Sequence, residues 1–300
     1  MSMKVDVIGV QPWRLPVGEF IALAKPRVNG LVVASAAVGY WLGAGAGGDT
    51  AVLLSTVGGT ALAAAGASAL NQLLERDVDA LMPRTRLRPL PAGRLRPIEA
   101  GWFAIVTTTA GLIVLALGAN LLAAATAFAT VLLYIGVYTP LKRRTAFATL
   151  VGAVPGALPP MIGWAAARAT LSPEAWVLFL IVFLWQIPHF LSIAWIYRND
   201  YAQAGLPLLP VIDPHGRRTA WHVLGFTSAL VPVAMLPSLD GAARSLYAVA
   251  ALFLTTGFVL VAIRFVRRRD LSGARWLFAA SVLYLPLLWI ALLVSRLPAR

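Results

Sequence analysis

The composition of this 300-residue chain is that of a protein embedded in a lipid bilayer. It is 59% hydrophobic and only 12% charged, whereas a soluble domain carries about 25% charged residues. Cysteine is absent, which excludes disulfides, thiolate nucleophiles and cysteine-based metal sites. The net charge of +13 comes from short basic stretches between apolar runs, which indicates membrane topology and not a nucleic-acid-binding surface.

The chain divides into a short N-terminal segment and one long apolar domain. Residues 1–19 lack an apolar stretch followed by a small-residue cleavage site, so we expect a cytoplasmic segment and not a signal peptide. Residues 20–296 contain apolar runs of about 20 residues, the length at which a helix crosses a bilayer. We therefore predict an all-α, polytopic membrane protein with about nine transmembrane helices. The predicted spans are residues 20–43, 50–73, 99–117, 121–140, 147–167, 174–197, 220–237, 243–263 and 275–295.

Several spans carry residues that shape a helix bundle. Small residues in 57–66 favour close helix packing. Prolines in the fifth and sixth spans predict kinks or interruptions, which are tolerated at membrane depth where they line a cavity. These prolines are Pro155, Pro159, Pro160 and Pro188.

The basic residues lie almost entirely on one side of the predicted spans. With the N-terminus inside, 21 of the 25 Lys and Arg residues fall on the inner side and four on the outer side. Because Lys and Arg accumulate in cytoplasmic loops, this predicts a multi-pass protein of the cell (inner) membrane with a cytoplasmic N-terminus. The two long polar connections, near 74–98 and 198–219, are both on the inner side, so we expect the chemistry at the cytoplasmic face.

The first long connection begins with three oxygen-bearing side chains at helical spacing. Asn71, Glu75 and Asp79 are four residues apart and share one face if the helix continues through them. Such oxygen ligands suit Mg²⁺, which prefers a few carboxylates together with phosphate oxygens and water. The sequence therefore predicts a Mg²⁺ site formed by these three residues.

Basic residues follow the predicted metal site and suit a diphosphate. Arg84, Arg86 and Arg88 come directly after it, and guanidinium groups bind phosphate bidentately. Lys142 lies in a basic cluster after the fourth span and is a further candidate contact. The alternative for all of them is plain topology charge, which the positive-inside rule explains without function.

The sixth span carries polar residues within an apolar helix. Gln186 and His189 share one face, and intramembrane polar residues usually serve a pathway or a site. The alternative for His189 is a structural histidine satisfied by a neighbouring helix. At the inner end of this span, Arg198 and Asp200 are positioned to complete the diphosphate site opposite Asp79.

These motifs resemble the UbiA superfamily of intramembrane prenyltransferases over residues 20–294, nearly the whole chain. The resemblance rests on Asn71, Glu75 and Asp79 followed by Arg84-Thr85 and Arg88-Pro89-Leu90. The chain departs from the common pattern at Gln72 and at Glu75, where many members carry Asp. Lys25-Pro26-Arg27 also fits the family, and on this basis Arg27 joins the expected diphosphate contacts.

The second motif resembles the protoheme IX farnesyltransferase (heme O synthase) branch of that superfamily. It reads Trp185-Gln186-x-Pro188-His189-Phe190, followed by Asp200-Tyr201. Quinone-pathway members carry several aspartates here, and only Asp200 remains. The resemblance adds Trp185 and Tyr201 to Gln186 and His189 as expected acceptor-binding residues.

The resemblance implies a helix bundle with a central cavity open toward the lipid. Farnesyl diphosphate would lie with its diphosphate on Mg²⁺ and its tail in the bundle, and the vinyl group of heme B would accept the farnesyl group to give heme O and diphosphate. A heme A synthase that uses the product is the implied protein partner. Two alternatives stay open: a prenyltransferase of the same fold acting on a quinone or other aromatic precursor, and a membrane transporter.

Overall fold

The computed structural model of the protein describes residues 17–239 and 244–296, and every regular element within them is helical. Most elements are α-helices, η1 and η3 are 3-10 turns, and η2 is a π-helical segment. In chain order they are α1 (Val17–Ala24), α2 (Pro26–Ala44), η1 (Gly45–Gly47), α3 (Thr50–Leu74), α4 (Arg76–Ala80), α5 (Pro97–Gly118), α6 (Leu121–Leu132), η2 (Leu133–Tyr138), α7 (Thr139–Leu141), α8 (Ala148–Ala157), α9 (Pro159–Arg168), α10 (Pro173–Ile196), α11 (Arg198–Gln203), α12 (Leu209–Ile212), α13 (Arg217–Met235), η3 (Leu236–Ser238), α14 (Arg244–Arg268) and α15 (Leu271–Val294).

Nine helical stretches among the described residues are long and apolar enough to cross a membrane. This confirms the predicted all-α class and the predicted number of spans. The stretches are Pro26–Gly47, Thr50–Leu74, Pro97–Gly118, Leu121–Leu141, Ala148–Arg168, Pro173–Ile196, Arg217–Ser238, Ser245–Arg268 and Leu271–Val294.

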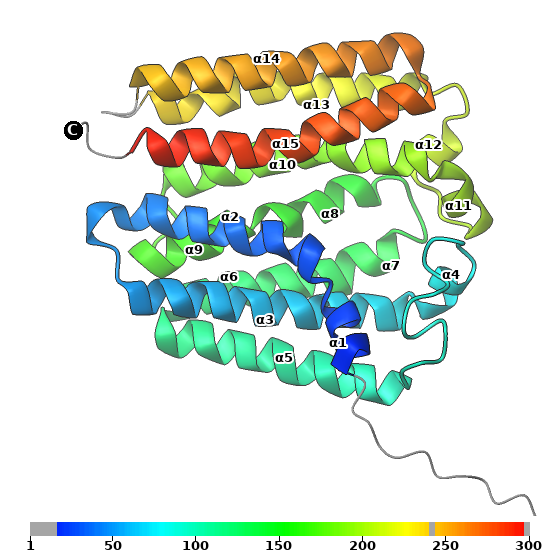
Figure 1. Ribbon diagram of the computed structural model, residues 1–300, viewed down its shortest axis with the longest axis horizontal. Helices are drawn as coiled ribbons and strands as arrows, with labels where there is room; N and C mark the ends of the chain where they lie inside the picture. The colour runs from blue at the N-terminus through cyan, green and yellow to red at the C-terminus, as the bar shows by residue number, and fades with distance from the viewer. Residues whose placement is uncertain (1–16, 240–243, 297–300) are drawn as a thin grey trace, which may run out of the picture.

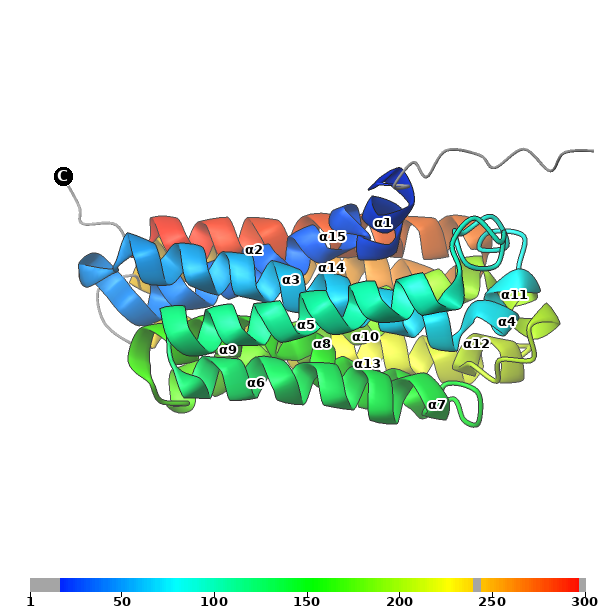
Figure 2. The same cartoon turned by 90° about the horizontal axis from the view of Figure 1, so that it is seen from below.

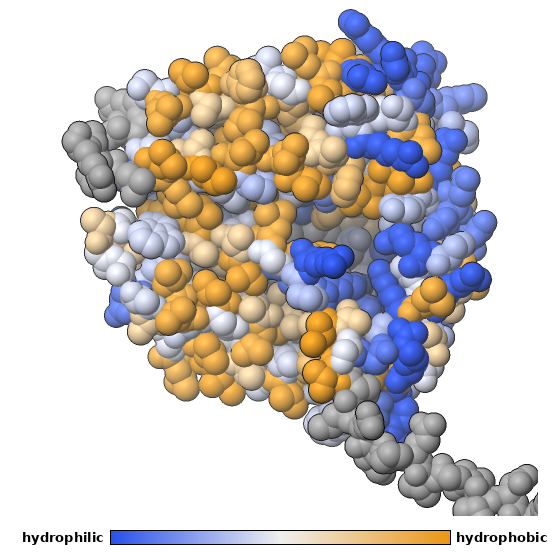
Figure 3. All heavy atoms as spheres, in the orientation of Figure 1, coloured by the Kyte–Doolittle hydropathy of each residue, from blue (hydrophilic) through white to orange (hydrophobic). Residues whose placement is uncertain are grey.

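The long helices run side by side, and the short helices α4, α7, α11 and α12 gather at one end of the bundle in both views (Figures 1 and 2). We call this end the polar end; it comprises these four helices and the connections 81–96 and 204–216. Hydrophilic residues concentrate there, whereas the body of the face in Figure 3 is mainly hydrophobic. Large apolar side chains such as Leu117 and Phe253 are 84% and 76% exposed on the body, as expected of a surface solvated by lipid.

Side-chain caps explain where several spans begin. Asp49 accepts hydrogen bonds from the amides of Ala51 and Val52 at the start of α3. Asn120 accepts one from Ala123 at the start of α6, and Asp270 accepts one from Gly273 at the start of α15. Each cap satisfies amides that have no partner within the helix.

Glycines allow two pairs of helices to touch backbone to backbone. Helix α3 packs on α5 at Gly59, Gly66 and Gly111; a β-carbon on Gly66 would stand 2.1 Å from Thr108 Oγ1. Helix α2 crosses α9 so closely that a β-carbon on Gly163 would lie 1.8 Å from the carbonyl oxygen of Ala36. Because lipid provides no hydrophobic force between helices, such close packing is a main source of their association.

The first span differs from the prediction of residues 20–43, because the chain breaks at Lys25. Helix α1 ends at Ala24, Lys25 adopts a left-handed conformation with φ of 47°, and α2 starts at Pro26. Pro26 suits a helix start, because it lacks the amide hydrogen that an interior position needs. The predicted segment 1–19 therefore ends in helix α1, and its residues 1–16 lie outside the described residues.

The prolines of the fifth and sixth spans behave differently. The fifth span divides at Leu158 into α8 and α9, as predicted from its prolines. Helix α10 continues through Pro188 without interruption, so of the two predicted effects only a kink stays a prediction there. The fourth span contains an unpredicted π-helical segment, η2, immediately before the polar end.

Candidate functional site

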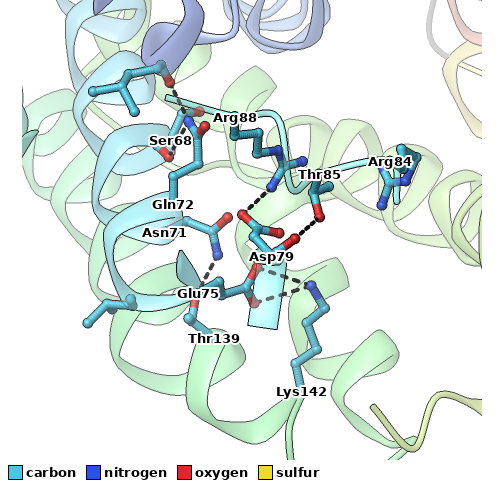
Figure 4. A network of polar contacts seen from close by, with 12 residues as sticks. Ser68, Asn71, Gln72, Glu75, Asp79, Arg84, Thr85, Arg88, Thr139 and Lys142 are labelled. Carbon is cyan, nitrogen blue, oxygen red and sulfur yellow. Dashed lines mark hydrogen bonds and ion pairs between the residues drawn. The ribbon is translucent and has the colours of Figure 1, made fainter. Parts of the chain in front are cut away.

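The two carboxylates of the first motif are buried side by side at the polar end of α3 (Figure 4). Helix α3 ends at Leu74, and α4 follows after Glu75. The amide of Glu75 bonds to the carbonyl of Asn71 at 2.9 Å, and that of Asp79 bonds to Glu75 at 2.7 Å. The i, i+4 spacing is thereby kept across the break, and Asn71, Glu75 and Asp79 are only 4%, 4% and 1% exposed.

Each buried carboxylate is paired with a cation from another part of the chain. Lys142 Nζ lies 3.2 Å from both carboxylate oxygens of Glu75. Arg88 donates to Asp79 Oδ2 at 2.6 Å. Charges this buried need such partners, because an unpaired charge away from water is strongly destabilising.

The site retains oxygen atoms that suit a divalent cation. Asn71 donates from Nδ2 to Thr139 Oγ1 at 3.3 Å, which orients its carbonyl oxygen Oδ1 as an acceptor. Neither Asn71 Oδ1 nor Asp79 Oδ1 receives a hydrogen bond from the described residues. The described residues 17–239 and 244–296 contain no group of three or more His, Cys, Asp or Glu side chains that could hold a metal. A metal here would therefore use two carboxylates and one amide oxygen, a donor set that fits Mg²⁺.

Neighbouring hydrogen bonds hold the backbone of this site in place. Thr85 donates to the carbonyl of Asp79 at 2.8 Å. Gln72, where the family pattern often has Asp, donates to the carbonyls of Leu23 and Ser68 and so joins α3 to α1. Arg143 donates to the carbonyl of Leu74 at 2.6 Å, satisfying an acceptor at the end of α3.

Arg84 links the two long polar connections, near 74–98 and 198–219, to each other. Its Nη2 donates to the hydroxyl of Tyr201 at 3.3 Å, and its guanidinium lies 4.8 Å from the centre of the Tyr197 ring. Residues of both connections, including Met82 and Leu206, pack in one small apolar cluster. The second motif thus supports an arginine of the first.

An apolar cavity of about 290 Å³ is connected to the carboxylates through Lys25, which lines it and interacts electrostatically with Asp79 and Glu75. Lys25 lies at its polar end, where burial, followed by the positive charge of Arg88, lowers the pKa of this lysine to about 8. Tyr134 and Tyr138 also line it, and their rings stack 5.6 Å apart. The remaining walls come from α2, α3, α6, α8, α9 and α10: Val28, Asn29, Val32, Thr60, Ala63, Ala64, Ala67, Ser68, Ala127, Thr130, Val131, Gly152, Pro155, Gly156, Pro159, Ile162 and Phe190.

The polar residues of α10 join this helix to its neighbours. Gln186 donates to the carbonyl of Ala153 in α8 at 2.7 Å. Trp185 donates to the carbonyl of Ser281 in α15 at 2.8 Å, and His189 Nδ1 lies 2.8 Å from the hydroxyl of the same serine. Bonded in this way, none of the three residues lines the cavity, whereas Phe190 of α10 does.

Three predicted diphosphate residues lie outside the paired network. Arg198 is exposed and stacks over the Trp195 ring at 5.0 Å. Asp200 is partly exposed and makes no side-chain bond with the described residues. Arg27 is exposed on α2, whereas Lys25, two residues earlier, reaches the cavity.

Some residues of the site were not predicted from the sequence. Tyr134 was missed, although it is spaced four residues from Tyr138 and the two rings fall on one helix face. Lys25 was noted only as part of a motif. Ser281 is an isolated polar residue in the apolar middle of α15 and offered no signal.

The comparisons with known proteins agree with this geometry. The UbiA prenyltransferase family model matches residues 32–294. A protoheme IX farnesyltransferase from Solibacter usitatus is 45% identical over 93% of this chain and 98% of its own length. One from Salinibacter ruber is 45% identical over 92% of this chain and 98% of its own length. The mitochondrial one from Arabidopsis thaliana is 40% identical over 91% of this chain and 64% of its own length.

Solved structures share the fold at low sequence identity. A structure of digeranylgeranylglyceryl phosphate synthase superposes with a TM-score of 0.78 at 15% identity, covering 93% of this chain and 98% of that one. A UbiA homologue from Archaeoglobus fulgidus, bound to GPP and Mg²⁺, gives 0.70 at 16% identity, covering 91% and 99%. The sequence and fold comparisons together show that this chain belongs to the UbiA prenyltransferase family.

Proposed function

We propose that this prenyltransferase transfers the farnesyl group of farnesyl diphosphate to a vinyl group of heme B, giving heme O and diphosphate. The observation that carries the proposal is the pair of buried carboxylates, each matched to a cation, at the mouth of an apolar cavity. Two relatives named protoheme IX farnesyltransferase are 45% identical to this chain and are matched over 98% of their own length. They support heme B over a quinone precursor as the acceptor. The family match favours an enzyme over the transporter alternative.

The diphosphate would bind where the carboxylates and their cations meet. Arg88 and Lys142 neutralise Asp79 and Glu75 in the described state. When the carboxylates and Asn71 bind a divalent metal ion, the side chains of Arg88 and Lys142 become available to bind the phosphate oxygens. Arginine forks suit this role because they bind phosphate bidentately and stay charged.

Mg²⁺ is the cation that we propose, on the oxygen-only donor set and on the A. fulgidus relative bound to GPP and Mg²⁺. Bound there, it would neutralise charge that develops on the leaving diphosphate. Lys25 and Arg84 would add positive charge at the rim, and we propose Arg27, Arg198 and Asp200 as outer contributors because they lie at the same end of the bundle.

The cavity would protect the allylic cation that forms when the C–O bond breaks. Most of its lining residues are apolar, among them Ala, Val, Gly, Pro, Ile and Phe, so water has few partners along most of the wall. The stacked faces of Tyr134 and Tyr138 lie at the polar end, where a cation–π contact would stabilise positive charge on the first farnesyl carbon. No general base is required to generate the nucleophile, since the vinyl group itself attacks. Water then captures the resulting cation, and the released diphosphate can accept the proton that this water loses.

We further propose that the polar end faces the cytoplasm in the cell (inner) membrane. The excess of basic residues at that end supports this orientation. Arg168 and Arg296 lie at the opposite end, Arg168 as the last residue of α9 and Arg296 just after α15. A heme A synthase that takes up the product stays a prediction.

The test is an assay of the purified protein in detergent with heme B, farnesyl diphosphate and Mg²⁺. Pigments are extracted and resolved by chromatography and mass. We expect a new heme heavier by one farnesyl group and one water, which is lost on adding EDTA. Prenylation of an aromatic acid or quinone precursor, with no heme product, would retain the diphosphate site and overturn the proposed acceptor.

A further inference from the structure

The imidazole ring of His189 is fixed by three side chains on α10 and α15. It stacks on Trp185 at 5.1 Å between ring centres and on Phe278 at 5.3 Å. Its Nδ1 lies 2.8 Å from the hydroxyl oxygen of Ser281. The two aromatic faces define the ring plane, and the hydrogen bond defines its rotation within that plane.

The hydrogen-bond network assigns the tautomer of this histidine. Ser281 Oγ donates its only proton to the carbonyl of Phe278 at 2.6 Å, so toward His189 it is an acceptor. Nδ1 of His189 therefore carries the proton, and Nε2 keeps its lone pair. Trp185 donates to the carbonyl of Ser281 at 2.8 Å and holds this serine in register with α10.

Nε2 of His189 has no hydrogen-bond partner among the described residues, and the side chain is partly exposed within an apolar span, where lipid offers it none. Polar atoms in this environment normally find a partner, and those that do not call for an explanation. A histidine that donates one ring N–H to a fixed acceptor while presenting the other nitrogen is the usual arrangement of a metal-ligating histidine. His222 likewise bonds through Nδ1, to the carbonyl of Arg218 in its own helix, but it is exposed next to the polar end, where water can serve as the partner of its other nitrogen.

We propose that Nε2 of His189 is an axial ligand to the iron of the heme acceptor, and that Ser281 is the residue that positions it. This inference rests on the proposed function. The next residue, Phe190, lines the prenyl cavity, so a porphyrin on His189 would have its edge beside the farnesyl chain. Figure 3 shows the surface hollowed between the α1–α2 junction and the polar-end half of α15, the helix that carries Ser281.

The first experiment compares hemin with metal-free protoporphyrin IX binding to purified protein in detergent. Both porphyrins share the same apolar ring and differ in the iron. We expect hemin to bind at least about tenfold more tightly, as the loss of a metal–ligand bond implies. His189→Ala should abolish this advantage and leave protoporphyrin IX binding unchanged, whereas the control His222→Ala should keep it.

Resonance Raman spectra of the ferrous heme complex identify the ligand directly. The iron–imidazole stretching band should be present in the parent protein and absent from His189→Gly. Added imidazole should restore it by occupying the slot between Trp185 and Phe278. An iron–imidazole band that persists in His189→Gly without added imidazole would overturn the assignment of His189 as the ligand. A folded His189→Gly variant in which added imidazole does not restore the band would contradict the placement of the ligand between Trp185 and Phe278.

A third set of variants tests Ser281. Ser281→Ala should lower hemin affinity roughly tenfold and shift the iron–imidazole band to lower frequency, because Nδ1–H loses its acceptor. Ser281→Thr should retain the band position. Ser295→Ala is the matched control, since Ser295 makes the same kind of bond to the carbonyl of Leu292 on the same helix and has no histidine partner.

The outcomes separate this inference from the proposed function. Protein that binds neither porphyrin and forms no heme product would overturn the function itself. Protein that forms heme O, and keeps the hemin advantage after His189→Ala, would retain the function and overturn the axial ligand.

Discussion

The two polar motifs of the molecule, residues 71–94 and 185–211, occupy similar places in the chain and are built differently. The first keeps two buried carboxylates, each paired with a cation. The second keeps one carboxylate, Asp200, which is partly exposed and has no side-chain partner among the described residues. Trp185, Gln186 and His189 of this motif bond instead to carbonyls of α8 and α15 and to the hydroxyl of Ser281.

This difference indicates that the chemistry of the leaving group and the binding of the acceptor are divided between the motifs. The first has the charges needed to bind and release a diphosphate. The second has aromatic rings, an amide and an imidazole, which suit a flat and largely apolar acceptor. Substitutions that affect one motif should therefore leave the task of the other intact.

The largest effect is expected from removing the charge of Asp79. Asp79→Asn should lower the rate of farnesyl transfer by about 10²–10³-fold, because a buried charge at the reacting diphosphate contributes several kcal/mol. Asp200→Asn should change it by less than about threefold, as expected of a partly exposed charge. Initial rates with saturating heme and Mg²⁺ provide the measurement. Equal losses in the two variants would show that the motifs share the metal site.

Next in size is the effect of breaking the pair between Glu75 and Lys142. Lys142→Met leaves a buried carboxylate without its partner, which should destabilise the protein by about 3–5 kcal/mol. The double variant Glu75→Gln/Lys142→Met should recover most of the thermal stability in detergent and remain inactive. Recovery of activity together with stability would mean that the pair is only structural.

A smaller effect concerns Lys25 and pH. Its pKa of about 8 means that it is charged below that pH and neutral above it. We expect kcat/KM for farnesyl diphosphate to decrease about tenfold as pH rises through 8, since a charged hydrogen bond contributes roughly 1.5–3 kcal/mol. Lys25→Arg should keep the plateau at higher pH, because guanidinium stays protonated. An unchanged profile in that variant would assign the decrease to another group.

The smallest effect is expected where the motifs meet. Tyr201→Phe removes the hydroxyl that receives the bond from Arg84 and leaves the stacking on Tyr197. KM for farnesyl diphosphate should rise about two- to fivefold, in line with one hydrogen bond of about 0.5–1 kcal/mol. The hemin affinity of this variant should not change. A larger loss of hemin than of farnesyl diphosphate affinity would place Tyr201 with the acceptor instead.

The spans and the first motif could be predicted because they depend on local patterns. The length of an apolar run predicts a membrane-spanning helix, and a four-residue spacing predicts that Asn71, Glu75 and Asp79 share one helix face. The partners of these acids could not be predicted, because Lys142 lies 67 residues from Glu75 along the chain. The orientation of His189 toward α15 depends in the same way on a serine 92 residues away.

Two local irregularities of the backbone also could not be predicted from the sequence. The left-handed conformation at Lys25 could not be predicted, because Pro26 only disfavours the right-handed α conformation there and a lysine adopts the left-handed one where the surrounding packing imposes it. The π-helical segment η2 likewise looks like an ordinary apolar helix in sequence. Both irregularities lie beside the cavity, where Lys25, Tyr134 and Tyr138 line its polar end.

The close crossing of α2 and α9 determines which part of the cavity is rigid. Pro159 and Ile162, which line the cavity, flank the point where Gly39 and Gly163 bring the two backbones into contact. The two glycines have no side chain to move, and their backbones are already in contact with the facing helix. The opposite end is bounded by the break at Lys25 and by η2, where regular helical bonding is interrupted. The cavity should therefore adjust to its substrates at the polar entrance and keep a fixed depth.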